Sequence, residues 1–273
     1  MSTLNITIIQ TNLFWEDKQA NLRLMDEKLS SIHEPGHIII LPEMFTTGFT
    51  MHPCELAEKM DGTTTEWMKK KSKEKKAIIT GSIIVEENDT EGERNYYNRL
   101  LWTLPNGQIG YYDKRHLFAY AGEHEHYRHG NKRVIFSVNG WKILPQICYD
   151  LRFPVWSRQQ MIKDNNGSTP EYDMIMYVAN WPEKRKHAWS SLLIARAIEN
   201  QCYVVAVNRT GTDGNDIQYS GNSMLIDPLG EIIFEQENHD CVKTLSVSKP
   251  ELEACREKFA FLRDADKFQL FKE

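Results

Sequence analysis

Cys148 is the residue in this chain best placed to act as a nucleophile. It ends the apolar run Trp141–Ile147, which is typical of a strand, and residues 149–154 (YDLRFP) follow it directly. The stretch from Pro154 to Lys163 is short of breakers and predicts a helix with proline in its first turn. The partial positive charge at a helix N-terminus favours thiolate over thiol. The sequence therefore predicts an activated sulfur nucleophile.

Two charged residues occupy the same position relative to other predicted strands. Glu43 follows the apolar strand His37–Leu41 through Pro42, and Lys114 follows the strand Gln108–Asp113. Taken singly, such residues are usually a loop carboxylate and a surface cation, and a free cysteine is usually a small core residue. Clefts, however, form at strand ends in layered α/β proteins, so we expect the three to converge. Together they can act as base, electrostatic stabiliser and nucleophile.

The elements that must position these residues alternate between strands and helices. Hydrophobic periodicity predicts helices at Lys18–Ser31, Thr63–Lys75, Lys186–Glu199 and Lys249–Phe259. It predicts further strands at Asn5–Thr11, Ala77–Val85, Met174–Val178, Tyr203–Asn208 and Cys241–Val247. Hairpin signals stand at residues 105–107 (PNG), 139–140 (NG) and 228–230 (PLG). This pattern predicts an α+β fold with mixed α/β layering, and because no linker divides the chain, a single domain over residues 1–273.

Composition excludes several classes of protein. The 273 residues are 41% hydrophobic and 26% charged, which is ordinary for a globular protein with a core. A net charge of −5 argues against nucleic acid as a partner. No segment reaches the roughly 18 apolar residues of a membrane span, and the N-terminus does not resemble a signal peptide. The five cysteines are scattered and form no CxxC pair, which predicts reduced thiols and a cytoplasmic location.

Four motifs, in this order, resemble the nitrilase superfamily of carbon–nitrogen hydrolases. They are LPEMF at residues 41–45, YDKRHLF at 112–118, ICYDLRFP at 147–154 and ANWP at 179–182. The order Glu43, Lys114, Cys148 matches the triad of that family. The resemblance runs from about Asn5 to Phe234 and implies a four-layer α-β-β-α sandwich. Because family members commonly pair through one helical layer, it also implies a homodimer or higher homo-oligomer, formed through the helices after Cys148 and at Lys186–Glu199.

Within that superfamily the chain resembles the omega-amidase branch, especially its bacterial members. The relevant segment is GEHEHY at residues 122–127, because the family often has a second glutamate in this loop that positions the lysine. Counted back from Gly130, Glu123 matches best, and Glu125 stays open as the alternative. His124, His126 and His129 lie in the same region, but their spacing does not match a metal motif. We therefore expect no metal and no cofactor.

The residue types predict amide hydrolysis through a thioester. Cys148 would attack the carbonyl carbon, and Glu43 would pass the thiol proton to the departing ammonia and then activate water. Lys114 and the backbone N–H of Tyr149 are the candidate oxyanion donors. The resemblance assigns Glu123 the role of keeping Lys114 charged and oriented.

The resemblance implies small omega-amides of 2-oxo dicarboxylic acids as substrates, such as 2-oxoglutaramate and 2-oxosuccinamate. Their carboxylate requires a cation or polar cluster in the pocket. Arg115, His116 and Arg152 are the candidates, although Arg152 could instead pair with Asp150 or another structural acid. The candidate pocket walls are Phe118, Tyr149 and Trp181.

Two other functions stay open at this point. The same triad could act on another amide, an N-carbamoyl compound or a nitrile. A redox-sensing or binding protein would use Cys148 as its reactive thiol, without any need for Glu43 and Lys114.

Overall fold

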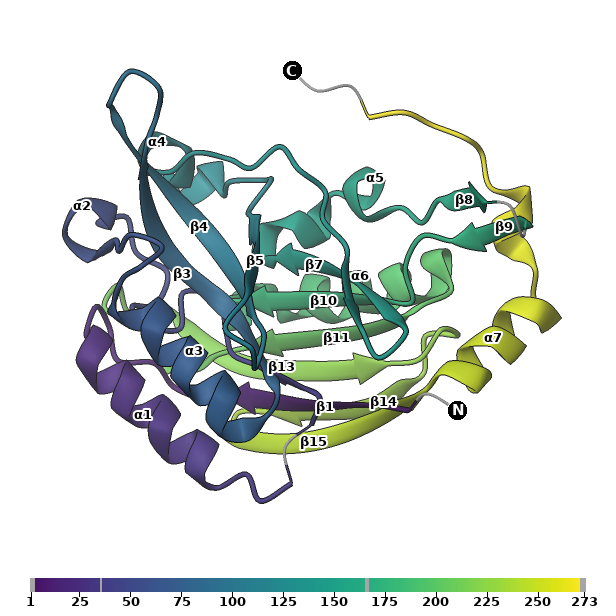
Figure 1. The fold of residues 1–273 in the computed structure, drawn as a ribbon, viewed down its shortest axis with the longest axis horizontal. Helices are drawn as coiled ribbons and strands as arrows, with labels where there is room; N and C mark the ends of the chain where they lie inside the picture. Colours follow the sequence, from purple (N-terminus) through teal and green to yellow (C-terminus); the bar gives the residue numbers. More distant parts are fainter. Residues whose placement is uncertain (1–2, 35, 165–166, 271–273) are drawn as a thin grey trace.

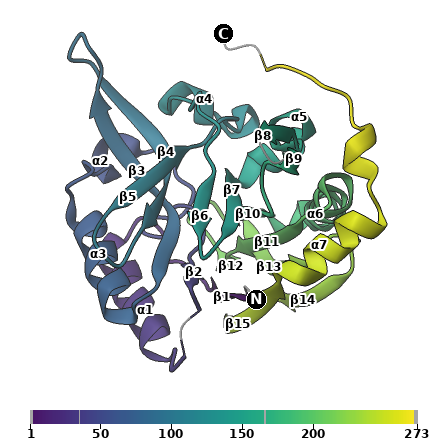
Figure 2. The same cartoon turned by 45° about the vertical axis from the view of Figure 1, so that its right-hand side comes forward.

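Two β-sheets face each other at the centre of the molecule, and helices cover their outer faces (Figures 1 and 2). The computed structural model describes residues 3–34, 36–164 and 167–270. The first sheet has the order β15 (Cys241–Ser248), β1 (Thr3–Gln10), β2 (Ile38–Ile40), β3 (Ile78–Asn88), β4 (Arg94–Thr103) and β5 (Ile109–Asp113). The second has the order β12 (Thr210–Thr212), β13 (Gln218–Ile226), β11 (Tyr203–Asn208), β10 (Met174–Ala179), β7 (Trp141–Ile147) and β6 (Phe136–Val138), with β14 (Ile232–Glu237) paired to β13.

Strand β2 shows how an apolar run is divided between two layers. Ile38 and Ile40 belong to the core between the sheets, whereas Ile39 belongs to the core beneath the helices α1 (Lys18–Ser30) and α3 (Thr63–Lys75). This division follows from the alternation of side chains along a strand. A strand buried on both faces needs apolar residues at every position, as β2 has.

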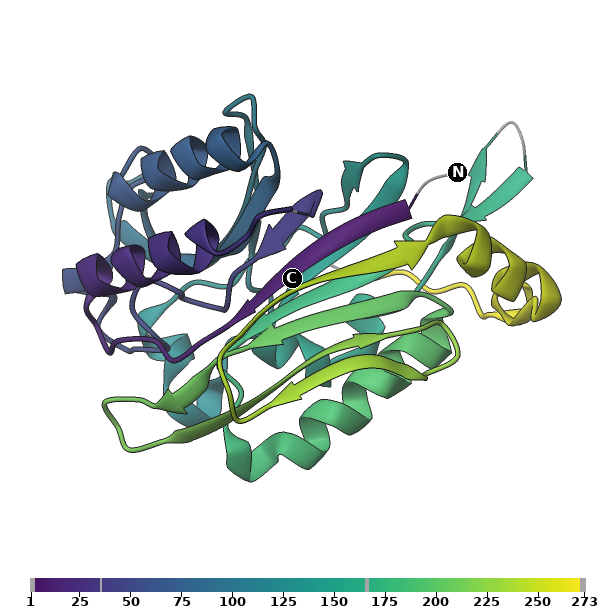
Figure 3. The same cartoon turned by 90° about the horizontal axis from the view of Figure 1, so that it is seen from below.

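The second sheet repeats this arrangement against the helix α6 (Lys186–Asn200). Met174 and Met176 of β10 face the first sheet, whereas Ile175 of the same strand packs with Trp189 and Leu193 of α6. The layers therefore run helices, sheet, sheet, helix, as the view from below shows (Figure 3). This confirms the α+β class and the four-layer sandwich.

Strand direction brings distant residues to one edge of the molecule. Strand β2 runs parallel to β3. Strand β4 is antiparallel to β3 and to β5, so β5 runs in the same direction as β2 and β3. In the second sheet, β7, β10 and β11 are parallel to one another. Residues that follow β2 and β5 therefore lie at one edge of the first sheet, and residues that follow β7 and β10 lie at one edge of the second.

The helix predicted from Pro154 to Lys163 is wrong. The helix α5 ends after one turn (Pro154–Ser157), and β8 (Met161–Asp164) follows it and pairs with β9 (Gly167–Pro170). Tertiary hydrogen bonds outweigh local helix propensity here, because the backbone N–H of Gln159 donates to Asn200 Oδ1 at 2.8 Å and its side chain bonds Tyr172.

The other helices and strands predicted above are present, with ends shifted by up to three residues. The remaining elements are α2 (Pro53–Leu56), α4 (Glu123–His126), α7 (Lys249–Lys258) and the 3₁₀ turns η1 (Ala119–Ala121), η2 (Cys148–Arg152), η3 (Glu183–Arg185) and η4 (Phe261–Asp264). None of the helices in the described ranges combines the length and the apolar character that a membrane crossing requires.

Candidate active site

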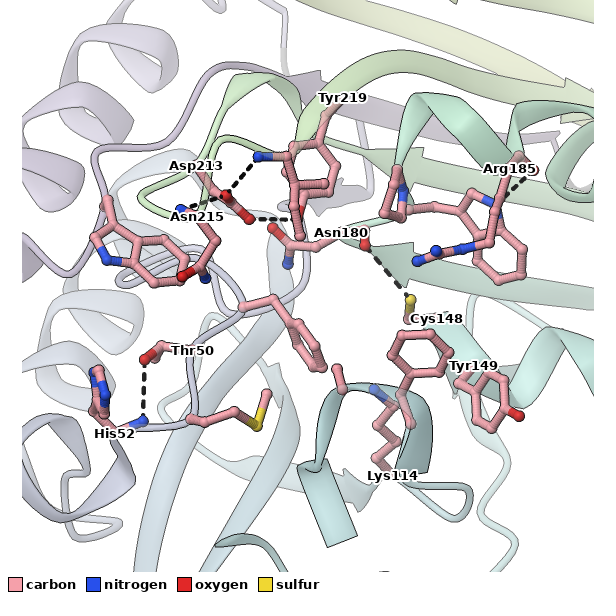
Figure 4. Close-up of a pocket in the computed structure, with 18 of the residues that line it drawn as sticks. Thr50, His52, Lys114, Cys148, Tyr149, Asn180, Arg185, Asp213, Asn215 and Tyr219 are labelled. Atoms are coloured by element: carbon pink, nitrogen blue, oxygen red, sulfur yellow. Dashed lines mark hydrogen bonds between the residues drawn. The ribbon is translucent and has the colours of Figure 1, made fainter. Parts of the chain in front are cut away.

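A cavity of about 300 Å³ opens at the edge where these strand ends meet (Figure 4). Its lining includes Lys114 and Cys148, together with four further residues singled out in the sequence: Phe118, Tyr149, Arg152 and Trp181. Glu43 and Glu123 are fully buried and contact Lys114 from behind the lining. The fold thus brings the three strand-end residues, Glu43, Lys114 and Cys148, to one place.

Glu43 is held by donors from both sheets. Its Oε1 accepts hydrogen bonds from Lys114 Nζ at 3.0 Å and Asn98 Nδ2 at 2.8 Å. Its Oε2 accepts the backbone N–H of Asn180 at 2.7 Å, and the Asn180 amide also donates to the Glu43 carbonyl. Asn98 lies in β4 and Asn180 directly follows β10. The carboxylate is therefore fixed in position across the junction of the two sheets.

Lys114 is clamped between two carboxylates. Its Nζ donates to both oxygens of Glu123 at 2.9 Å, and Phe118 N donates to Glu123 Oε2. Burial lowers the pKa of Lys114, but the charges of Glu123 and Glu43 outweigh burial and hold the pKa above its usual value. Of the two glutamates left open by the sequence, Glu123 makes this contact, whereas Glu125 is exposed. The ammonium group is thus kept charged and oriented.

Cys148 stands at a sharp bend in the backbone. Its φ of 44° lies in the left-handed region, which is rare for a residue with a side chain, and the η2 turn begins there. The bend directs Sγ into the cavity, 3.9 Å from the carbonyl oxygen of Asn180 (Figure 4).

The predicted thiolate at Cys148 is wrong for the free site. Burial raises the pKa of the Cys148 thiol well above its usual value, and the Glu43 charge raises it further against the opposing effect of Lys114. The helix that was expected to lower the pKa is absent, since only short turns follow Cys148. The thiol therefore keeps its proton until a base removes it.

Asp150 fixes the turn that carries Cys148. Its Oδ2 accepts Ile147 N at 3.0 Å and the Tyr112 hydroxyl at 2.8 Å, and its Oδ1 accepts His116 N at 2.9 Å. The carboxylate is fully buried. It ties the strand end before Cys148 to the segment that follows Lys114.

Two of the predicted carboxylate anchors do not line the cavity, and that prediction is wrong for Arg115 and His116. Arg115 Nη1 lies 3.0 Å from His129 Nδ1, and its guanidinium lies over the ring of Trp156. The His116 ring is bonded to Asp150 and stacks on Phe153. Both side chains are taken up by contacts with the η2–α5 region instead of the cavity.

Arg152 does line the cavity, and it makes no ion pair with Asp150. Its guanidinium lies over the ring of Trp181, with Cζ 4.9 Å from the ring centre. Phe118 and Tyr149 form another part of the wall and contact each other edge to face. Arg152 thus lines the cavity and forms no ion pair with any acid among the described residues.

Several residues of the site escaped the sequence analysis. Asn180 lies within the ANWP motif, so the sequence indicated that its position matters. The sequence did not indicate that Asn180 bonds Glu43. Arg185 lies three residues after that motif, and nothing in the sequence distinguished it from the neighbouring cations. Asp213 and Tyr219 also line the cavity and are bonded to each other at 2.8 Å. Within the described residues, no group of three His, Cys, Asp or Glu side chains is arranged to hold a metal ion.

Comparison with known proteins identifies close relatives. The carbon–nitrogen hydrolase family model matches residues 5–256. The chain is 46% identical to omega-amidase YafV of Yersinia enterocolitica, over 99% of this chain and all of that protein. It is 31% identical to 2-oxoglutaramate amidase of Bacillus subtilis, over 96% and 97% of the two chains.

Among solved structures, the fold is similar to that of XC1258 from Xanthomonas campestris. That protein is described as a CN-hydrolase superfamily member with an arsenic adduct in its active site. The TM-score is 0.94 at 40% identity, and the match covers 99% of this chain and all of the other.

Proposed function

Because the chain belongs to the carbon–nitrogen hydrolase family, we propose that it is an omega-amidase that hydrolyses the terminal amide of small 2-oxo dicarboxylic acids. The names of two relatives support this substrate class. The observation that carries the chemistry is the buried cluster of Glu43, Lys114 and Glu123 beside a thiol that faces a cavity. The products would be the 2-oxo acid and ammonia.

In the first half of the reaction, the Cys148 sulfur bonds to the amide carbonyl carbon while the thiol proton moves to Glu43. The negative charge that develops on the carbonyl oxygen is stabilised by Lys114 and by the N–H of Tyr149 at the start of the η2 turn. Glu43 then protonates the nitrogen, the carbon–nitrogen bond breaks, and ammonia leaves. A thioester on Cys148 remains.

In the second half, Glu43 removes a proton from water as the water oxygen attacks the thioester carbon. The carbon–sulfur bond breaks, and the proton on Glu43 returns to the sulfur. Each step is a proton transfer to or from Glu43 coupled to bond making or breaking at the carbonyl carbon. No atom changes its oxidation state, so the cycle needs no redox partner. Glu123 acts through Lys114 and is a positioning residue in this scheme.

The test is ammonia release from 2-oxoglutaramate and 2-oxosuccinamate, measured beside a nitrile, an N-carbamoyl amino acid and a longer amide. Wild-type protein should release ammonia fastest from the two 2-oxo amides. Cys148→Ala should lose at least about 10³-fold in rate because the nucleophile is gone, while its circular dichroism stays unchanged. Faster turnover of a nitrile or N-carbamoyl compound, or near wild-type activity in Cys148→Ala, would refute the proposal.

A redox-sensing role for Cys148 makes a different prediction about the cluster. Such a role would survive replacement of both Glu43 and Lys114, whereas amide hydrolysis would not. Two results together would favour the sensor: thiol oxidation that is intact in the double variant, and no amidase activity in the wild type.

We further propose that the protein is cytoplasmic and works as a homodimer. The five cysteines are all unpaired in the structure, which suits a reducing compartment. Ile198 on α6 and Ile232 and Ile233 on β14 are exposed apolar residues. The Gly230 turn packs closely on Ile198, so α6 and the start of β14 form one surface that a second copy could cover.

A further inference from the structure

Two arginines line the cavity beside Cys148, and the guanidinium group of each lies over an aromatic ring. Arg152 lies over Trp181, and Arg185 lies over Phe118 with Cζ 5.1 Å from the ring centre. Both are half-buried. In Figure 4 the side chain of Arg185 extends toward the part of the cavity that holds Cys148. The cation–π contact restrains each guanidinium group and leaves its N–H groups available to a ligand.

Neither guanidinium has an acid partner within the described residues. Two buried arginines elsewhere do, Arg99 with Asp113 and Arg196 with Glu199, whereas the buried Arg209 donates to carbonyl and amide oxygens instead. The carboxylate of the cavity wall, Asp213, is already used, because it accepts the Tyr219 hydroxyl and the N–H groups of Asn215 and Ile217. To whatever enters it, the cavity therefore presents two guanidinium groups without an ion-pair partner in the described ranges.

We propose that Arg152 and Arg185 together bind the carboxylate and the 2-oxo oxygen of the substrate, and so select 2-oxo acid amides against 2-amino acid amides such as glutamine. A guanidinium fork matches a carboxylate with two parallel hydrogen bonds. The 2-oxo oxygen is a further acceptor for the same donors. An ammonium group at that carbon has only donors and a positive charge, so the two arginines repel it. This inference rests on the proposed function and assigns its specificity.

The first experiment compares Arg185→Gln with wild type on three amides of equal chain length. They are 2-oxoglutaramate, glutamine and pentanamide, which has neither carboxylate nor oxo group. The KM for 2-oxoglutaramate should rise at least about tenfold, because charge-assisted bonds to the substrate are lost. The kcat should change less than about threefold, and turnover of pentanamide should fall much less than that of 2-oxoglutaramate. The preference for 2-oxoglutaramate over glutamine should fall.

Lys184→Gln is the matched control, because it removes the same charge from the same η3 turn. Lys184 is exposed and does not line the cavity. Its KM values should equal those of wild type. Arg185→Lys keeps the charge without the fork and should give an intermediate KM for 2-oxoglutaramate. Arg152→Gln tests the second arginine in the same way, with circular dichroism as the check on folding.

An equal loss on all three amides in Arg185→Gln, or an unchanged KM for 2-oxoglutaramate in both Arg185→Gln and Arg152→Gln, would overturn the assignment. Failure of the proposed function is distinguishable, since wild type would then release no ammonia from 2-oxoglutaramate. In that case 2-oxoglutarate serves as the probe, as an inhibitor of whichever amide the protein hydrolyses. Inhibition that weakens at least about tenfold in Arg185→Gln supports the arginine pair, and inhibition that is absent or unchanged refutes it.

Discussion

At the level of single residues, burial and a neighbouring carboxylate govern the thiol of Cys148. Burial and Glu43 raise the pKa of the thiol, and Lys114 does not offset them. Glu43 therefore has two opposite effects, because its charge suppresses the thiolate and its oxygen removes the thiol proton during attack. Replacing it separates these effects.

Glu43→Gln should lose about 10²–10⁴-fold in amide turnover because the general base is gone. The same variant should react faster with iodoacetamide at Cys148 near pH 7. Loss of a neighbouring negative charge favours the anionic form of an acid, so the pKa of the thiol falls, and each unit raises the thiolate fraction about tenfold while the pKa stays above the pH. Peptide mass spectrometry separates Cys148 from the other thiols.

Glu125→Gln is the control for this comparison, because Glu125 is an exposed carboxylate in the loop that carries Glu123. Both its turnover and its alkylation rate should match wild type. Unchanged or slower alkylation of Cys148 in Glu43→Gln would show that Glu43 does not suppress the thiolate.

At the level of elements, the η2 turn depends on one buried side chain. Asp150 accepts hydrogen bonds from the backbone before Cys148 and from the segment after Lys114. Asp150→Ala leaves those donors buried and unpaired, which we expect to lower the free energy of unfolding by about 2–4 kcal/mol. Because the turn also aims Sγ, kcat should fall as well. Urea unfolding and ammonia release measure the two effects.

Asp227→Ala provides the comparison for an exposed turn. Asp227 also accepts two backbone N–H groups, from Leu229 and Glu231, but at the surface. Its loss should cost less than about 1 kcal/mol and leave kcat unchanged, because water replaces the carboxylate. Equal costs for the two variants would mean that burial of Asp150 has no special role.

At the level of the whole molecule, the site is built from both sheets. Glu43 and Lys114 follow strands of the first sheet, and Cys148 and Asn180 follow strands of the second. The hydrophobic cluster that contains Ile38, Ile40, Met174 and Met176 extends across both sheets. We therefore propose that the two sheets unfold together as one domain.

Guanidinium unfolding at two protein concentrations tests both the single domain and the homodimer. Tryptophan fluorescence and far-ultraviolet circular dichroism should give one coincident transition. Its midpoint should rise with protein concentration, because dimerisation stabilises only the folded chain. Sedimentation velocity at micromolar concentration should give twice the mass of the chain. Two separate transitions would contradict the single domain, and a monomer would contradict the dimer.

Exposed apolar residues on α6 and β14 provide a direct check on the interface. Ile198→Glu places a charge on the surface that we expect a second copy to cover, so it should shift sedimentation to the monomer. Lys184→Gln, outside that surface, should leave the mass unchanged. A dimer that persists in Ile198→Glu would place the interface elsewhere.

The sequence by itself determined the strands that precede Glu43, Lys114 and Cys148, and the four motifs in which these residues and Asn180 lie. These follow from local rules, because alternation and unbroken apolar runs predict strands wherever the chain is buried. The same rules failed for residues 154–163, where bonds from Gln159 to Asn200 and Tyr172 override helix propensity.

Only the tertiary structure decided which charged side chains share the cavity. Arg115 and His116 stand beside Lys114 in the sequence yet contact Trp156 and Asp150, whereas Arg185, which no motif contained, lines the cavity. It also decided the direction in which the pKa of Cys148 moves, which burial and Glu43 raise. The direction of a side chain and its pKa both depend on neighbours that the fold brings together from both sheets. The local sequence does not determine which residues those neighbours are.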